Sequence, residues 1–463
     1  MATALLSPLA ESKRSVFWLD SPAAPEPLAP LEGERRCRLA IVGGGFTGLW
    51  AALLAAPGED VVLLEGERCG WAASGRNGGF VDASLTHGLD NGMARWPGEV
   101  ERLTRLGNEN FAAIGDTLAA RGIDAGWEQN GTIDVATRPH ELGGLAESAE
   151  LARAQGAKVT LLDGEELRAL VHSPTYLGGL LRRDGVALVD PARLAWGLRG
   201  AALEDGVRIH EGTRVTRIRA DGAGVVLETG AGRLRAERAV LATGAFRPLA
   251  RSIGRYVIPV YDYVLVTQPL SAERRAAIGW HGRQGLADSG NRFHYYRLTA
   301  DDRILWGGYE AVYHWRNGLR PELEERPEVF NLLARNFHAT FPQLEGIGFS
   351  HRWAGVIDTC SRFCVTFGTG LGGRLAYAVG YTGLGVAASR FGARVALDLV
   401  HGRDSELTRL ELVRSHPIPF PPEPARSALV QATRRALIRA DENEGRRGPW
   451  LKLLDRVGAG FDS

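Results

Sequence analysis

The chain has 463 residues, 44% of them hydrophobic and 24% charged, which is typical of a globular protein with two or three domains. Its 55 Lys and Arg nearly balance its 54 Asp and Glu, so charge gives no reason to expect nucleic acid or an acidic surface as partner. Four scattered cysteines favour a reducing compartment, and without a signal-peptide pattern or a run of ~18 apolar residues we expect a cytoplasmic protein with no membrane span.

Residues 1–36 are expected to form an extended arm. They are rich in proline and lack helical or strand periodicity, which is typical of a segment laid over a protein surface. We expect Phe17 and Trp18 to anchor this arm.

A glycine turn follows the arm. Residues 39–42 predict a buried strand that leads into three glycines with G-x-G-x-x-G spacing and then into helical periodicity. Such glycines allow a tight turn, close approach of a phosphate and close packing of helix on strand, and the N–H groups that begin the helix face the ligand's charge. The expected ligand contacts are Gly43, Gly45, Phe46, Thr47 and Gly48.

A carboxylate supports this interpretation. A second apolar strand over 61–64 ends in Glu65, twenty residues after Gly45, which is the spacing at which an acid reaches a ribose hydroxyl pair. The two features together predict a dinucleotide site; the alternative is that the glycines serve packing alone.

A second run of small residues occupies 70–80. Because nothing bulky keeps a ligand away, its N–H groups, a hydroxyl and a guanidinium could contact a phosphate or a planar ring; the alternative is a flexible surface loop. The expected contacts are Ser74, Arg76, Asn77, Gly78 and Gly79.

Helical and strand patterns alternate over the next part of the chain. The expected elements are helices over 97–123, 139–155 and from Gly164, strands near 129–135 and 159–162, and an antiparallel pair between Leu177 and Val189. Asp190 and Pro191 then predict the N-cap and first residue of another helix. Strands are expected at 207–210, 215–227 and 239–242, and the last ends in Thr243 and Gly244, where small residues allow a ligand to approach.

Residues 255–349 have a different character. Segments at 260–267, 293–297 and 303–308 predict an antiparallel sheet rich in aromatic residues. Such a sheet suits the wall of a pocket for a partly apolar, cationic or zwitterionic ligand, although each aromatic residue could equally serve the core.

A third glycine segment lies near the C-terminal end. Residues 375–386 predict a strand, a glycine turn and the start of a helix that reaches about Val400. The expected ligand contacts are Gly380, Thr382, Gly383, Leu384 and Gly385. A proline-rich link and a basic amphipathic helix over 425–440 follow, and we expect this helix to pack on the surface or on a neighbouring subunit rather than on a membrane.

The glycine turn, Glu65 and the run ASGRNGG at 73–79 together resemble the D-amino-acid-oxidase superfamily of FAD enzymes, most closely the branch that contains gamma-glutamylputrescine oxidase-type amine oxidoreductases. The resemblance implies that the turn binds the ADP pyrophosphate, that Glu65 binds the adenosine ribose and that the run lies beside the flavin. It also places the strand before Thr243 against a non-covalently bound FAD, and the helix that follows Gly385 against the flavin pyrimidine edge.

The expected fold class is α/β, with a discontinuous Rossmann-like FAD-binding domain and an inserted α+β substrate domain built on a mixed or antiparallel sheet. We expect the FAD-binding domain to comprise 37–97, 190–250 and 350–403, the substrate domain 98–189 and 251–349, and the C-terminal link and helix 404–463. The pocket should lie where the two domains meet.

The motifs favour redox chemistry. A Walker loop, H-E-x-x-H and G-x-S-x-G are absent from the sequence, which removes the hydrolase and NTPase interpretations. We expect an FAD-dependent oxidoreductase that oxidises the C–N bond of a small amine or amino acid to an imine, with O2 as acceptor and H2O2 as product. The alternatives are an FAD amine dehydrogenase with another acceptor, an NAD-dependent dehydrogenase, and a non-catalytic FAD-binding redox sensor or subunit. An oligomer is compatible with the sequence.

Catalytic candidates are less specific. Several enzymes of the family use a lysine above the flavin, but none of the three lysines here lies in the expected region, so we consider His294, Arg297 and His351 as the cationic group. Cys360 and Cys364 have no matching His or Cys pair, so no metal site is expected, while covalent flavin attachment through either remains an alternative. A substrate carboxylate could be held by Arg76, Arg297 or Arg362, although each could instead be a surface or structural arginine.

Overall fold

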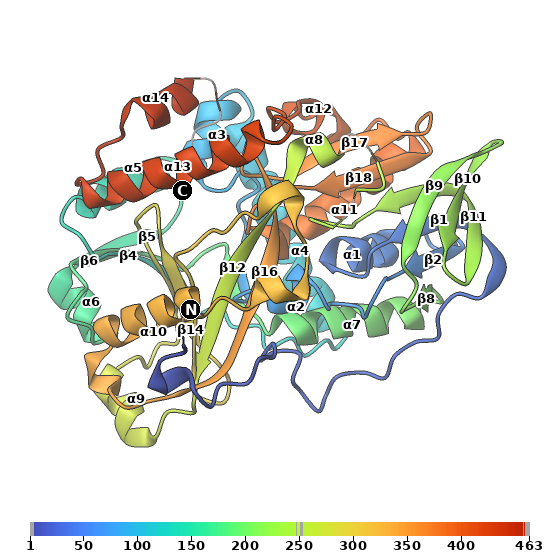
Figure 1. Cartoon of the computed structure of the whole chain (residues 1–463). Helices are drawn as coiled ribbons and strands as arrows, with labels where there is room; N and C mark the ends of the chain where they lie inside the picture. The colour runs from blue at the N-terminus through green and yellow to red at the C-terminus, as the bar shows by residue number, and fades with distance from the viewer. Residues whose placement is uncertain (1–3, 247, 251–252, 457, 459–463) are drawn as a thin grey trace.

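Two large sheets organise the chain in the computed structural model, which describes residues 4–246, 248–250, 253–456 and 458 (Figure 1). The first sheet has the strand order β17-β18-β11-β1-β2-β8, with β10 and β9 added to β11 as an antiparallel extension. Its strands are β1 Gly33–Val42, β2 Val61–Leu64, β8 Arg208–His210, β9 Val215–Asp221, β10 Gly224–Thr229, β11 Gly232–Leu241, β17 Thr366–Gly370 and β18 Leu375–Val379. The sheet is therefore assembled from stretches that lie far apart in the sequence.

The strand β1 lies at the centre of this sheet because residues 39–42 are apolar and buried on both faces. It pairs in parallel with β11 on one side and with β2 on the other, and β18 pairs in parallel with β11. The carboxyl ends of these strands therefore meet at one edge of the sheet, where ligands of open α/β sheets bind.

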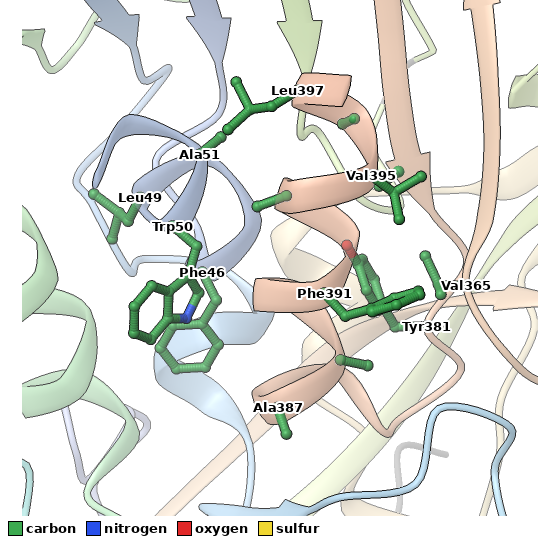
Figure 2. Packing of buried hydrophobic residues seen from close by; sticks show 14 of the residues in the cluster. Phe46, Leu49, Trp50, Ala51, Val365, Tyr381, Ala387, Phe391, Val395 and Leu397 are labelled. Carbon is green, nitrogen blue, oxygen red and sulfur yellow. The ribbon is translucent and has the colours of Figure 1, made fainter. Parts of the chain in front are cut away.

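Helices cover one face of the first sheet. They are α1 Phe46–Leu54, α4 Val100–Ala120, α7 Pro191–Glu204 and α11 Gly385–His401, with the shorter α2 Ala73–Arg76, α3 Leu89–Arg95 and α12 Glu411–Arg414 nearby. Figure 2 shows α1 and α11 side by side, with Leu49 and Trp50 on one helix and Phe391 and Val395 on the other. This packing joins residues separated by more than three hundred positions into one core.

The second sheet has the order β16-β12-β15-β14-β13-β4-β6-β5. Its strands are β4 Thr132–Ala136, β5 Val159–Asp163, β6 Gly178–Arg182, β12 Val257–Thr267, β13 Gly285–Asp288, β14 His294–Leu298, β15 Ile304–Gly308 and β16 Phe349–Cys360. The helices of this half are α5 Glu141–Ala154, α6 Gly164–Leu170, α9 Ala272–Ile278 and α10 Pro327–Thr340, while the short α8 Ile253–Tyr256 leads into β12 and packs Ile253 against the first sheet. Because side chains alternate along a strand, Tyr261 and Tyr263 of β12 pack in the same core as Phe330 of α10, while Val264 packs with Trp18 and Trp353 toward the first half.

The N-terminal arm and the C-terminal helices pack against the two sheets. The N-terminal arm begins with η1 Ser7–Leu9, and Trp18 is buried and donates from Nε1 to the Asn77 carbonyl at 2.9 Å, as its predicted anchoring role requires. Near the C-terminus, α13 Ala425–Glu442 and α14 Pro449–Arg456 lie over the second half (Figure 1). Asp441 of α13 accepts a 2.7 Å hydrogen bond from the Asn291 amide, and Arg434 pairs with Glu310. Among the described residues, no helix is both long and apolar enough to cross a membrane.

The α/β fold class is confirmed, and most predicted elements occur, including α7, whose N-cap Asp190 accepts from the N–H groups of Ala192 and Arg193. The antiparallel pair predicted between Leu177 and Val189 is wrong. The two strands exist, but β6 pairs with β4 and β5, whereas β7 (Val186–Leu188) pairs with β3 (Phe80–Asp82) in a separate small sheet. The strand β16 belongs to the second sheet, although the predicted boundary at 350 grouped it with the cofactor domain.

Candidate active site

A cavity of about 950 Å³ is lined by residues from both sheets. From the first half it takes the glycine turn, the end of β2, the 71–78 run, residues 242–246 and the start of α11. From the second half it takes parts of β12 and β16, residues 291–293, Tyr295, residues 308–311 and Tyr313, and part of α13 covers it. All three glycine segments predicted from the sequence therefore open into one space.

The glycine turn requires glycine at two positions for steric reasons. Gly43 has a φ of +109°, and a Cβ there would lie 2.3 Å from the Ala242 carbonyl oxygen at the end of β11. A Cβ at Gly48 would lie 1.8 Å from the Gly43 carbonyl oxygen, so α1 could not pack this closely on the turn. The start of α1 is thereby held against the cavity with its N–H groups toward it.

Glu65 ends β2 beside this turn. One carboxylate oxygen accepts from the Gly44 N–H at 2.6 Å and the other from the Glu67 N–H at 2.8 Å. Burial raises the pKa of Glu65, and these two N–H groups oppose the shift. A carboxylate in this position can accept hydrogen bonds from the hydroxyls of a ribose.

The 73–79 run forms the short helix α2 and a turn that its own side chains hold in place. The Ser74 hydroxyl accepts from the Phe46 N–H at 2.9 Å, and the Asn77 amide donates to the carbonyls of Ala73 and Ser74. The Arg76 guanidinium donates to the Trp71 and Ala354 carbonyls, each at 3.0 Å, and pairs with Glu324 at 2.9 Å. The polar side chains that were expected to contact a ligand therefore also form hydrogen bonds within the protein.

The third glycine segment is tied to the first. The Thr47 hydroxyl of α1 donates to the Tyr381 hydroxyl at 2.8 Å, and Figure 2 shows Tyr381 beside α11. Asp358 of β16 accepts from the N–H of Gly380 at 2.7 Å and from the N–H of Tyr381 at 3.3 Å. Burial raises the pKa of Asp358 to about 7. The start of α11 at Gly385 consequently faces the cavity from a fixed position.

The sequence matches the family model described as FAD dependent oxidoreductase over residues 38–399. The chain belongs to this family. It is 32% identical over 401 residues to the gamma-glutamylputrescine oxidoreductase of Escherichia coli strain K12, covering 85% of this chain and 90% of that protein. It is 27% identical over 405 residues to the probable oxidoreductase OrdL of Haemophilus influenzae, again covering 85% and 90%. These matches confirm the resemblance found in the sequence.

A solved structure has the same fold. The glycine oxidase of Geobacillus kaustophilus superposes with a TM-score of 0.67 over 82% of this chain and 99% of that chain, at 24% identity. As a member of its family, the chain is an FAD-dependent oxidoreductase, and its cofactor is FAD.

The residues of the cavity fit this cofactor. The Thr243 hydroxyl, just after β11, is buried in the cavity wall and has no hydrogen-bond partner among the described residues, so it is available to a ligand. Most of the predicted FAD contacts line the cavity: Gly43, Gly45, Phe46, Thr47, Glu65, Ser74, Arg76, Asn77, Gly78, Thr243, Gly244, Thr382, Gly383, Leu384 and Gly385. Gly48, Gly79 and Gly380 lie behind the wall, where packing requires a small residue; a Cβ at Gly79 would lie 2.1 Å from the Val189 carbonyl oxygen.

The three catalytic candidates lie outside the cavity lining. His294 is stacked between Trp306 and Tyr309, with ring centroids 4.3 and 4.7 Å away, and burial lowers its pKa to about 3. Arg297 is buried and donates to the Val189 carbonyl at 2.6 Å. His351 contacts Asp20 of the N-terminal arm, with 3.1 Å between Nε2 and the carboxylate. Their assignment stays a prediction that this geometry does not support.

Both cysteines considered for covalent attachment are buried thiols. Burial raises the pKa of Cys360, which lines the cavity, and raises that of Cys364 to about 12. Arg362 lies behind the wall and donates to the carbonyls of Ser415 and Val365. It is thus placed to support the backbone rather than to hold a substrate.

Sequence reasoning missed Asp262 and Tyr295, which face each other in the cavity wall. The Tyr295 hydroxyl donates to the Asp262 carboxylate, and burial raises the pKa of Asp262 to about 6. The signal in the sequence was a single acid within the otherwise apolar and aromatic stretch 260–266.

Proposed function

We propose that this enzyme oxidises the C–N bond of a small amine or amino acid to an imine and uses O2 as acceptor, with H2O2 as product. The observation that carries the proposal is one continuous cavity that joins the three glycine segments to the aromatic wall of β12 and β14. Relatives named for gamma-glutamylputrescine and glycine support a C–N bond as the reacting group.

The chain's own residues would hold FAD at one end of this cavity. The glycine turn and the start of α1 would bind the pyrophosphate, Glu65 the ribose, and Thr243 and the start of α11 the flavin. When bound, FAD supplies the oxidant, accepting two electrons from the substrate and passing them to the acceptor.

The remaining residues would position the substrate and exclude water. Tyr295, Tyr309 and Phe420 line the substrate end, so a partly apolar molecule can be held there away from solvent. A substrate fixed over the flavin needs no nucleophile from the protein, which agrees with the absence of hydrolase motifs in the sequence.

A dehydrogenase that passes electrons to another acceptor is the second candidate. It is favoured by one observation: lysine does not occur among the described residues that line the cavity, and each arginine of the lining has a carboxylate partner. Relatives named D-amino acid dehydrogenase also match this chain, at 28% identity over 324 residues. The NAD-dependent alternative is set aside because the family uses FAD.

The test is an anaerobic titration of the purified yellow protein with a panel of amines and amino acids. Loss of flavin absorbance with at least one of them is expected, followed by recovery on admission of O2 with one H2O2 formed per turnover. Bleaching that O2 fails to reverse, but a dye acceptor does, would identify the dehydrogenase. A flavin that no compound bleaches would favour the non-catalytic sensor.

A further inference from the structure

The substrate end of the cavity contains one acid that differs from the rest. Asp262 lies on β12 between Tyr261 and Tyr263, which pack with the core of the second half, so the Asp262 side chain emerges on the opposite face and lines the cavity. Its carboxylate accepts from the Tyr295 hydroxyl and from the backbone N–H groups of Tyr263 and Gly308. These donors fix its position.

The other acids of the lining are already engaged. Glu310 pairs with Arg292 and Arg434, Glu67 with Arg214, and Asp82 with Arg182. Glu65 and Asp358 have no cationic partner in the part of the chain that the structure describes, but both hold N–H groups of the glycine segments at the FAD end. Within the described chain Asp262 makes no ion pair, and it is the acid left for a ligand at the substrate end.

The cations of the lining are engaged as well. Arg76 pairs with Glu324 and bonds two carbonyls, and Arg214 pairs with Glu67. Arg292 lies over the Tyr309 ring, 4.7 Å from its centroid, and contacts Glu310 and Asp441. A substrate carboxylate would therefore have to displace a protein carboxylate from one of these arginines. A substrate ammonium group would instead meet the Asp262 carboxylate, which has no cationic partner among the described residues.

Neighbouring strands leave room for such a group. Gly355 of β16 lies directly opposite Asp262 and has no side chain, and Gly307 of β15 lets the Tyr295 ring lie over it, since a Cβ there would be 2.5 Å from the ring. Among the described titratable and charged groups, the Tyr295 hydroxyl from β14 contacts Asp262. Arg76 from α2 has its Cβ and carbonyl oxygen beside Gly355, and its guanidinium pairs with Glu324. Because Asp262 is partly buried and has no counter-ion, a bound cation should stabilise its ionised form more than that of the other acids in the lining.

We propose that Asp262, held in place by the Tyr295 hydroxyl, binds the ammonium group of the substrate, and that the substrate is a cationic amine with no carboxylate on the carbon that bears the nitrogen. This inference rests on the proposed amine oxidation, because it names the substrate class of the same cavity. The aromatic residues of the wall then hold the apolar body of the amine.

Binding of unreactive probes tests the proposal without turnover. Tert-butylammonium and 2-aminoisobutyrate both lack a hydrogen on the carbon that bears nitrogen, and the second differs from the first by a carboxylate in place of a methyl group. Calorimetric titration of the FAD-bound protein should show tighter binding of tert-butylammonium than of 2-aminoisobutyrate. Equal affinity, or preference for 2-aminoisobutyrate, would overturn the proposal.

Two variants locate the site. Asp262→Asn should weaken tert-butylammonium binding by about tenfold or more, because a hydrogen bond to a charged group contributes about 1.5–3 kcal/mol. Asp288→Asn is the matched control: Asp288 is also a buried acid that accepts from a tyrosine hydroxyl, that of Tyr296, but it does not line the cavity. The control should bind the probe as the wild type does, and an unchanged affinity in Asp262→Asn would refute the proposal.

A pH titration covers the case in which Asp262→Asn fails to fold. Affinity of the wild type for tert-butylammonium should fall as the pH drops through about 6, where Asp262 takes up a proton. Tyr295→Phe removes a donor that lowers the pKa of Asp262, so the midpoint should move to higher pH. A midpoint that Tyr295→Phe leaves unmoved would refute the assignment. If amines bind at Asp262 but none of them bleaches the flavin, the proposed function is refuted and the binding site is retained. If only amino acids bleach the flavin, the substrate class inferred here is refuted and the proposed oxidase activity is retained.

Discussion

Replacing Gly48 by alanine should expel FAD. The new Cβ would lie 1.8 Å from the Gly43 carbonyl oxygen, and ordinary contact between such atoms is about 3.5 Å, so α1 must move away by about 1.7 Å. That shift would break the 2.9 Å hydrogen bond from the Phe46 N–H to the Ser74 hydroxyl and turn the helix start from the cavity. The backbone on both sides is buried, so the added methyl should also lower the free energy of unfolding by about 1–3 kcal/mol.

The ratio of flavin to protein absorbance after purification measures the first effect, and thermal unfolding measures the second. Gly144→Ala is the matched control, because Gly144 is an exposed glycine of α5 whose Cβ would meet no atom within 4 Å. This control should keep its FAD and gain about 0.5–1 kcal/mol of stability from the lost backbone freedom. A Gly48→Ala protein that is fully yellow and melts like the wild type would show that the close contact in the turn does not position α1.

Three further outcomes are expected. Asp358 has its pKa raised to about 7 in the folded protein, above the value of about 4 of an unfolded aspartate, so its contribution to stability is complete below about pH 4 and is lost as the pH rises toward 7. The melting temperature of Asp358→Asn should therefore rise relative to that of the wild type between about pH 4 and about pH 7; a difference that does not change with pH would contradict this. His294→Gln should lower the melting temperature and leave kcat unchanged, since His294 lies outside the cavity lining, and a large loss of kcat would restore it as a catalytic candidate. Arg434→Met should free α13 from Glu310 and raise the substrate KM, with faster proteolysis of α13 as an independent readout, while unchanged KM and proteolysis would mean that this pair does not hold the cover.

The cofactor end was predictable from the sequence because its signals are local. A strand, a glycine turn and a helix follow one another in the 39–54 segment, and the glycines that the turn requires are only a few residues apart. Glu65 was found for the same reason, since it ends the adjacent strand. Thr243 and the 380–385 turn also follow directly on buried strands.

The substrate end was not predictable because it depends on which face a strand presents. His294 and Tyr295 are adjacent in the sequence, yet alternation along β14 places the first in the aromatic stack and the second in the cavity wall. Choosing between them requires the orientation of the sheet, which no single strand reveals. The wrong pairing of β6 with β7 has a related cause: both strands are short, and their true partners β4 and β3 lie elsewhere in the chain.

The discontinuous first sheet has a consequence for how the enzyme is made. Its central strand β1 leaves the ribosome before its partners: its neighbour β11 is synthesised about two hundred residues later, and α11, which packs on α1, later still (Figure 1). Long-range pairing of this kind folds slowly and leaves apolar edges exposed in the meantime. FAD can therefore be captured only after α11 has been synthesised, and a supply of free cofactor during expression should decide how much of the nascent chain reaches the folded state.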